Sequence, residues 1–269
     1  MKKNVLLIAF LILATSVAFL SCNKESDVVE TPQPYAVSYT DSIIYLKPST
    51  GDYIVNPVKT APGIYSGFPE GIEIDDNTGA INVSKSETGL RYRITHTATD
   101  GKVTTTMVVL SGITFTDHYF HFSTGDSVAR PVYNANKSRV LPLSGSSFDE
   151  GNVASTGGCD IKTANGQINL AQTVRNGIFG STPQNDVRKD FDIEYRLNDA
   201  SGKSLNKLRV RLYYYNTMAD VPADLLTTLQ DRDDNGVFLR PGAAATTNGA
   251  IAVERVTKPR PPCVIIIAH

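Results

Sequence analysis

The chain has 269 residues and a formal net charge of -1, with 26 Lys and Arg against 27 Asp and Glu. This balance excludes the strongly basic surface that is typical of nucleic-acid-binding proteins, so we expect no nucleic acid partner. Apolar residues make up 41% of the chain, enough for packed cores, and the length indicates one or two domains. Gly, Pro, Thr and Tyr are frequent, whereas long runs of Ala, Leu, Glu and Lys are missing, which favours β structure.

Residues 1–21 are typical of a secretory signal peptide. Lys2 and Lys3 make the start positive, and residues 5–20 are almost entirely apolar. A membrane-spanning helix usually needs about 20 apolar residues, so a short span is the weaker interpretation. We therefore exclude this segment from the fold prediction.

The end of this segment, Phe19-Leu20-Ser21-Cys22, resembles the lipobox of bacterial lipoproteins. In that family the signal is cut before the cysteine, which then carries the lipids. Phe19 departs from the pattern, since the family usually has Leu or Val there. The resemblance implies a membrane partner, reached through acyl chains on Cys22 that contribute about 0.8 kcal/mol per buried methylene. A cleaved signal without lipid and an uncleaved anchor remain alternatives.

Residues 22–34 are polar, contain two prolines and show no periodicity, which predicts a flexible tether. Asn23 after the cysteine is compatible with sorting to the outer membrane. The pair Lys24-Glu25 resembles the short charged export signals of surface lipoproteins in Bacteroidota-type bacteria, and an ordinary solvated linker is the alternative. We expect a lipid-anchored protein of the outer membrane, on the cell surface or the periplasmic face.

From Tyr35 onward, blocks of sequence occur twice in the same order. The clearest is a strand-turn-strand pattern at residues 71–83, which begin Gly-Ile-Glu-Ile-Asp-Asp and turn at Asp-Asn-Thr-Gly. It returns at residues 160–170, with the turn at Thr-Ala-Asn-Gly. Matched blocks in one order indicate a duplicated domain. The further matched blocks are Thr-Asp at 40–41 and 116–117, Ser-Thr-Gly-Asp at 49–52 and 123–126, and alternating strands at 92–98 and 191–197. The predicted domains are residues 35–113 and 114–269, the second with a C-terminal extension at 216–269.

Each copy consists of short strands separated by turns, which favours a β-sandwich. The run from Gly67 to Ile81, with the alternating strand and the Asp100-Gly101 turn that follow it, resembles the Ig-like domains of bacterial surface proteins, which are cadherin-like sandwiches. The resemblance covers most of the first copy. It is looser in the second, where the Pro-Glu-Gly part is missing. It implies an all-β fold of two tandem Ig-like β-sandwiches outside the cytoplasm, and no particular activity.

The second copy is longer than the first. Turn-rich insertions are predicted at residues 134–158 and 174–189. In the extension, residues 220–230 predict a short helix with a stripe of leucines. The apolar run at 263–268 predicts a buried extra strand in or beside the second sandwich, because an exposed apolar edge promotes aggregation. An edge that pairs with a partner is the alternative.

Asp231, Asp233 and Asn235 have the alternation of oxygen ligands that opens a calcium loop. The closing glutamate is absent, because Gly242 stands in its place. A plain helix-to-strand turn is therefore the favoured interpretation, and Ca²⁺ remains a weak candidate cofactor. His118 and His121 lie three apart on a predicted strand and so point to opposite faces, which argues against a shared metal.

Cys159 and Cys263 remain once lipidation has used Cys22. The cell envelope permits disulfides, and a bridge between these two would tie the extra strand to the repeated hairpin. Two separate buried thiols are the alternative.

His96 matches Tyr195 in the second copy, which indicates a packing position for both side chains.

No nucleophile elbow, Cys–His constellation or phosphate-binding glycine loop is present, so we predict no enzyme. The favoured function is a lipid-anchored module for binding or adhesion, or a structural spacer, with an unknown protein or glycan as ligand. An accessory glycan-binding lipoprotein of a polysaccharide-uptake system is the second hypothesis. An enzyme with its site in the loops of the second copy is the third.

Overall fold

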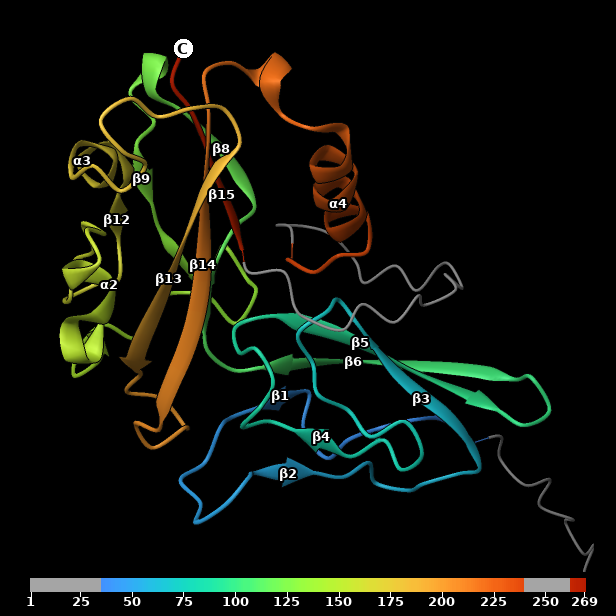
Figure 1. Ribbon diagram of the computed structural model, residues 1–269. Helices are drawn as coiled ribbons and strands as arrows, with labels where there is room; N and C mark the ends of the chain where they lie inside the picture. The colour runs from blue at the N-terminus through green and yellow to red at the C-terminus, as the bar shows by residue number, and fades with distance from the viewer. Residues whose placement is uncertain (1–34, 240–261) are drawn as a thin grey trace, which may run out of the picture. The chain divides into compact units, whose positions relative to one another are not determined.

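The computed structural model describes residues 35–239 and 262–269, which belong to one compact unit (Figure 1). The predictions for the signal peptide at 1–21, for lipidation of Cys22 and for the tether at 22–34 lie outside the described residues. Within these described ranges, no helix has both the length and the apolar character needed to cross a membrane.

Strands dominate the structure and helices are few, so the prediction of an all-β fold is confirmed. We call β1 to β6 the first module and β7 to β15 the second. The first module contains β1 (Ile43–Ile44), β2 (Ile54–Val55), β3 (Gly63–Phe68), β4 (Ile81–Asn82), β5 (Arg91–Ala98) and β6 (Val103–Leu110). The second contains β7 (Ile113–Phe115), β8 (His118–His121), β9 (Val128–Ala129), β10 (Pro131–Tyr133), β11 (Ser147–Phe148), β12 (Ile168–Asn169), β13 (Val187–Arg196), β14 (Leu205–Tyr215) and β15 (Cys263–Ile267).

The helices among the described residues belong to the second module and its extension. They are α2 (Val153–Thr156), α3 (Leu170–Arg175) and α4 (Ala223–Asp234), with the 3-10 turns η1 (Phe122–Thr124), η2 (Glu150–Asn152) and η3 (Met218–Asp220). The predicted helix of the extension is therefore present, although it starts at Ala223, because Thr217 and Asp220 cap η3 in front of it. Leu225 and Leu229 are buried on α4, while Leu226 is exposed.

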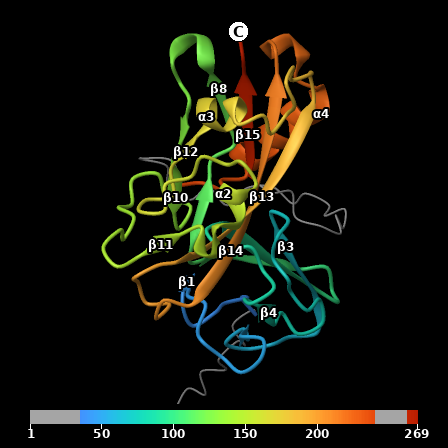
Figure 2. The same cartoon turned by 60° about the vertical axis from the view of Figure 1, so that its left-hand side comes forward.

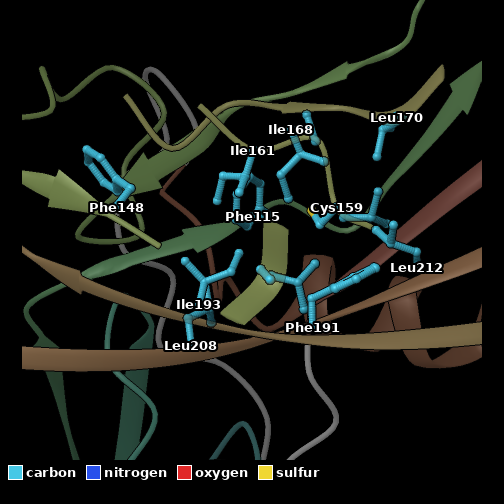
Figure 3. Packing of buried hydrophobic residues seen from close by; sticks show 14 of the residues in the cluster. Phe115, Phe148, Cys159, Ile161, Ile168, Leu170, Phe191, Ile193, Leu208 and Leu212 are labelled. Atoms are coloured by element: carbon cyan, nitrogen blue, oxygen red, sulfur yellow. The ribbon is translucent and has the colours of Figure 1, made fainter. Parts of the chain in front are cut away.

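Each module has a main sheet, with one smaller strand pair in the first module and two in the second. The main sheet of the first has the order β1-β6-β5-β3 with β2-β4 as the pair, and that of the second has the order β11-β13-β14-β15-β8 with β12-β9 and β10-β7 as pairs. On β5 and β13 alternate side chains point into the cores, as the period-2 pattern predicts. Each module has its own hydrophobic cluster, and Figure 3 shows the second.

The two turns that repeat in the sequence make matching hydrogen bonds. Asp75 N–H donates to Ala80 C=O over 2.9 Å in the first module, and Lys162 N–H donates to Gln167 C=O over 2.8 Å in the second. Gly79 N–H donates to Asp75 C=O over 2.8 Å, and Gly166 N–H to Lys162 C=O over 2.7 Å. The strand pairing agrees as well, since β2 pairs with β4 in the same register as β9 with β12.

The predicted insertion at 134–158 is more structured than expected. It contains β11, η2 and α2. Phe148 on β11 is buried and stacks on Tyr195 of β13 with ring centroids 6.4 Å apart. Because β11 pairs with β13 as β3 pairs with β5, this part is the counterpart of β3, and only its surroundings are inserted. The short strand β11 was not predicted, because the Ser and Gly residues around it are typical of a loop.

Two glycines in the repeated turns are required by backbone geometry. Gly79 has φ +73° and Gly166 has φ +70°, in the left-handed region. A Cβ at Gly79 would lie 2.7 Å from Tyr65 Cδ1, and one at Gly166 would lie 2.9 Å from Phe148 Cδ1. The glycines thus admit a large aromatic ring from β3 or β11 against the turn.

We expect Gly79→Ala and Gly166→Ala each to lower the free energy of unfolding by about 1–3 kcal/mol more than Gly101→Ala, because of overpacking. Gly101 is the matched control, since its φ is +83° and a Cβ there meets nothing within 4 Å. Urea unfolding of the three variants measures the difference. Equal losses in all three would contradict the role of the aromatic contacts.

Candidate functional site

Charged side chains gather where the extension meets the rest of the structure. Asp117 directly precedes β8, and its carboxylate lies 3.1 Å (Oδ2) and 3.2 Å (Oδ1) from Arg232 Nη1 on α4. The same Oδ1 accepts the Cys263 N–H at the start of β15 over 2.7 Å. One carboxylate therefore connects β8, α4 and β15.

The first module contributes two further acids. Glu70 Oε2 lies 3.9 Å from Arg232 Nη2. Glu87 interacts electrostatically with Arg232, Asp117 and Glu70 and lines the same cavity as Asp117 and Arg232. We call Glu70, Glu87, Asp117 and Arg232 the junction cluster.

The position of Glu87 follows from its local hydrogen bonds. Its N–H donates to Gly71 C=O over 2.6 Å, and its C=O accepts the Tyr92 hydroxyl over 2.8 Å. Gly71 has φ +110°, and a Cβ there would lie 3.0 Å from Glu87 Oε2. The glycine of the Pro-Glu-Gly motif thus makes room for this buried acid.

Burial dominates the electrostatics of the cluster. It raises the pKa of Glu87 to about 8, with Arg232 acting in the opposite direction and Asp117 and Glu70 adding to the rise. Glu87 is therefore mostly protonated at pH 7. Burial alone would lower the pKa of Arg232, but Asp117, Cys263 and Glu70 together outweigh it and the pKa lies above its ordinary value. Arg232 remains a buried cation beside Asp117.

The cavity next to the cluster is small. It has room for about one water molecule. Apolar residues make up most of its walls. The lining residues are Pro69, Glu87, Leu90, Thr114, Phe115, Asp117, Arg232, Val237, Phe238 and Pro262. A carboxyl group with a raised pKa is often a general acid, but the cavity that the described residues form beside Glu87 admits only about one water molecule. The geometry indicates a structural role.

Further contacts join the two modules on either side of the cluster. Asn235 Oδ1 accepts from Arg93 Nη1 over 3.1 Å, and Val237 is buried in the hydrophobic cluster of the first module. Tyr195 of the second module has its hydroxyl 2.8 Å from Thr88 Oγ1 and accepts the Ile113 N–H over 3.1 Å. The segment after α4, predicted as part of the second module, thus packs on the first.

Cys159 is a free thiol, so the alternative of a bridge to Cys263 is wrong and the two residues are separately buried. The reason is their placement in different hydrophobic clusters. Cys159 belongs to the cluster that Figure 3 shows, and Cys263 packs with α4 and Tyr213. Burial raises the pKa of the Cys159 thiol to about 12, which keeps it protonated and unreactive.

The residues of the calcium candidate do not form a loop. Asp231 and Asp233 lie within α4, where positions two apart face different sides of the helix, and Asn235 caps its C-terminus. Asn235 already uses its side chain for Arg93 and for the Asp231 carbonyl. Among the described residues, no group of three or more His, Cys, Asp or Glu side chains could hold a metal ion.

The histidines occupy packing or surface positions. His96 and its counterpart Tyr195 are both buried, so the predicted packing role of this position is confirmed. His96 lies between Tyr35 and Tyr65, with ring centroids 4.7 and 4.6 Å away. His118 on β8 contacts Asp126 over 3.2 Å at the surface.

The aromatic clusters belong largely to the cores. Tyr213 and Tyr215 are buried beneath α4, and Phe120 packs into the second module. These rings therefore offer no flat exposed platform of the kind that stacks on sugars. Comparison of the chain with protein-family models and with curated proteins gives no match.

The junction cluster was not predicted from the sequence. Its residues lie far apart in the chain, and none belongs to a catalytic or metal motif. One signal was available, because Asp117 belongs to the repeated Thr-Asp pair while its counterpart Asp41 is exposed. The duplicated position thus acquires its role only through Arg232 and Cys263.

We expect Arg232→Met to lower the free energy of unfolding by about 3–5 kcal/mol, because Asp117 would remain as a buried charge that has lost its counter-ion. Arg209→Met is the matched control. Arg209 also forms a two-bond pair with Asp192, but its side chain is 57% exposed, so about 0–1 kcal/mol is expected. Chemical denaturation of both variants measures the free energies of unfolding. Similar losses in the two variants would contradict the effect of burial at the junction cluster.

The raised pKa of Glu87 predicts a pH dependence with a definite sign. Below pH 4.5, which is the ordinary pKa of a glutamate, Glu87 holds its proton in both the folded and the unfolded state. Its contribution to folding stability is then fully present. As the pH rises toward about 8, the unfolded state releases the proton first, and this contribution to stability is lost. Glu87→Gln should remove that loss, so the variant should gain stability relative to the parent between pH 5 and pH 8.

Glu150→Gln provides a control of opposite sign. Hydrogen bonds from Ser147 and Arg196 hold the pKa of Glu150 below its ordinary value, so its contribution is lost as the pH falls. Thermal unfolding at several pH values measures both effects. If the stability of Glu87→Gln changed with pH in parallel with that of the parent, the protonated state of Glu87 would be contradicted.

Proposed function

We propose that the chain is a lipid-anchored protein of the cell envelope whose two Ig-like sandwiches form a binding or adhesive module or a spacer. The observation that carries the proposal is the duplicated module, with matched turns, registers and buried positions in both copies. Duplicated β modules behind a lipobox-like start, Leu20-Ser21-Cys22, suit a protein that projects from a membrane.

The buried contacts between the modules favour this proposal. Tyr195, Asp117 and Arg232 connect segments of both modules with hydrogen bonds and ion pairs. Such contacts resist independent swinging of two domains. A spacer or adhesive protein benefits from that, because its binding surface stays at a set distance from its anchor.

The junction cavity favours a binding or structural protein over an enzyme. Glu87 has the raised pKa that catalysis often uses, yet the space beside it admits about one water molecule. Binding of a protein or glycan would then use the outer surface. A glycan array and a pull-down with the full chain distinguish these ligand classes, and turnover lost on a single acidic or His substitution would favour an enzyme.

The anchor is tested by metabolic labelling with a fatty-acid probe. Wild type should incorporate the probe and partition with the outer membrane, whereas Cys22→Ala should lose the label, because the acyl chains need the Cys22 sulfur. Cys159→Ala is the matched control and should keep the label, since that thiol is buried in the second module. Equal labelling of wild type and Cys22→Ala would contradict the lipid anchor.

A further inference from the structure

The last strand of the chain has no counterpart in the first module. There, β1 pairs directly with β6 in parallel, with Ile43 opposite Val109 and Ile44 opposite Leu110. In the second module, β8 follows the same Thr-Asp pair as β1 does, but it does not pair with β14. Instead β15 lies between β14 and β8 and is parallel to both, as Figures 1 and 2 show.

The inserted strand is buried on both faces. All five residues of β15, Cys263–Ile267, have an exposed fraction of 0%. Val264 and Ile266 pack into the core of the second module, while Ile265 and Ile267 pack beneath α4. An extended apolar segment between two strands therefore completes both hydrophobic layers.

The slot that holds this strand is formed by distant parts of the chain. Val264 lies opposite His118, 146 positions earlier, and residues 240–261 separate β15 from the last described residue after α4. That connection of 22 residues can span at most about 75 Å when fully extended. Its length therefore does not require the strand to enter the slot of its own copy.

The slot binds β15 through backbone and side-chain groups. These groups would be the same for the β15 strand of a second copy of the chain. Arg211 N–H donates to Pro262 C=O over 3.2 Å, and Asp117 accepts the Cys263 N–H over 2.7 Å. At the other end, Ala268 N–H donates to Tyr215 C=O over 3.1 Å. A strand of identical sequence from a neighbour makes the same contacts, which is the basis of strand and domain swapping.

From these observations we propose that the slot between β8 and β14 is a strand-acceptor site, and that residues Cys263–Ile267 of a second copy of this chain are its ligand. Exchange joins copies into a dimer or a longer assembly without creating any new interface chemistry. This inference names a partner, goes beyond the proposed function and does not depend on the lipid anchor.

The test traps the strand across copies. Two full-length copies with different epitope tags in the tether are produced together, one carrying Ile267→Cys and the other His121→Cys. These positions are opposite each other on β15 and β8, within the Cα separation that a disulfide bridges. Mild oxidation should give a mixed-tag disulfide only where the strand of one copy lies in the slot of the other.

Two controls define the outcomes. A single chain with both substitutions reports insertion into its own slot. Ile267→Cys combined with Tyr45→Cys, the matching position after β1, should give no mixed-tag product, because β1 pairs directly with β6. A second pair, Ile265→Cys with Tyr119→Cys, repeats the trap at another facing position in case one variant fails to fold.

A mixed-tag product with the slot pairs and none with Tyr45→Cys supports strand exchange. A disulfide within the single chain without any mixed-tag product overturns it. Absence of both products also overturns it, because β15 would then not lie beside β8. Loss of labelling at Cys22 is a separate result, so failure of the anchor and failure of this inference are distinguishable.

Discussion

The Asp117 carboxylate is the point on which three segments of the structure depend. It pairs with Arg232 on α4 and accepts the first N–H of β15, while its own residue directly precedes β8. The side chains of Asp117 and Arg232 are 10% and 9% exposed, so each charge needs the other. The extension is therefore held to the second module by charge at one end and by apolar burial along its length.

This arrangement explains how the two modules differ. A four-stranded sheet closes the first module by direct pairing of β1 with β6. The second module has a fifth strand and a covering helix, and the β13–β14 hairpin is longer. Its outer face carries cross-strand pairs of opposite charge, such as Asp190 with Arg211, which keep that face soluble.

Local patterns predicted most of the fold. Alternation along β5 and β13, the repeated turns, the helix of the extension and the burial of its apolar strand could all be found in the sequence. These features depend on neighbouring residues and on side-chain period. The position of β15 between β14 and β8 could not be found this way, because parallel pairing between distant segments leaves no local signal.

The junction cluster was beyond sequence reasoning for the same reason. Glu87 lies in the segment between β4 and β5, and Arg232 lies on a helix among acidic neighbours, so the sequence around each is typical of a solvated surface charge. Burial is what changes their chemistry, and burial comes from the meeting of both modules with the extension. The bridge suggested for Cys159 and Cys263 was wrong because two cysteines in a sequence do not reveal which side of a sheet each one faces.

The central claim is that β15 is an integral inner strand of the second module. Amide hydrogen exchange of the native protein tests it most directly, because inner strands exchange only through large-scale unfolding. We expect the amides of Val264 to Ile267 to be protected as strongly as those of β14 beside them. Exchange of these amides as fast as that of the exposed turn at Gly101 would contradict it.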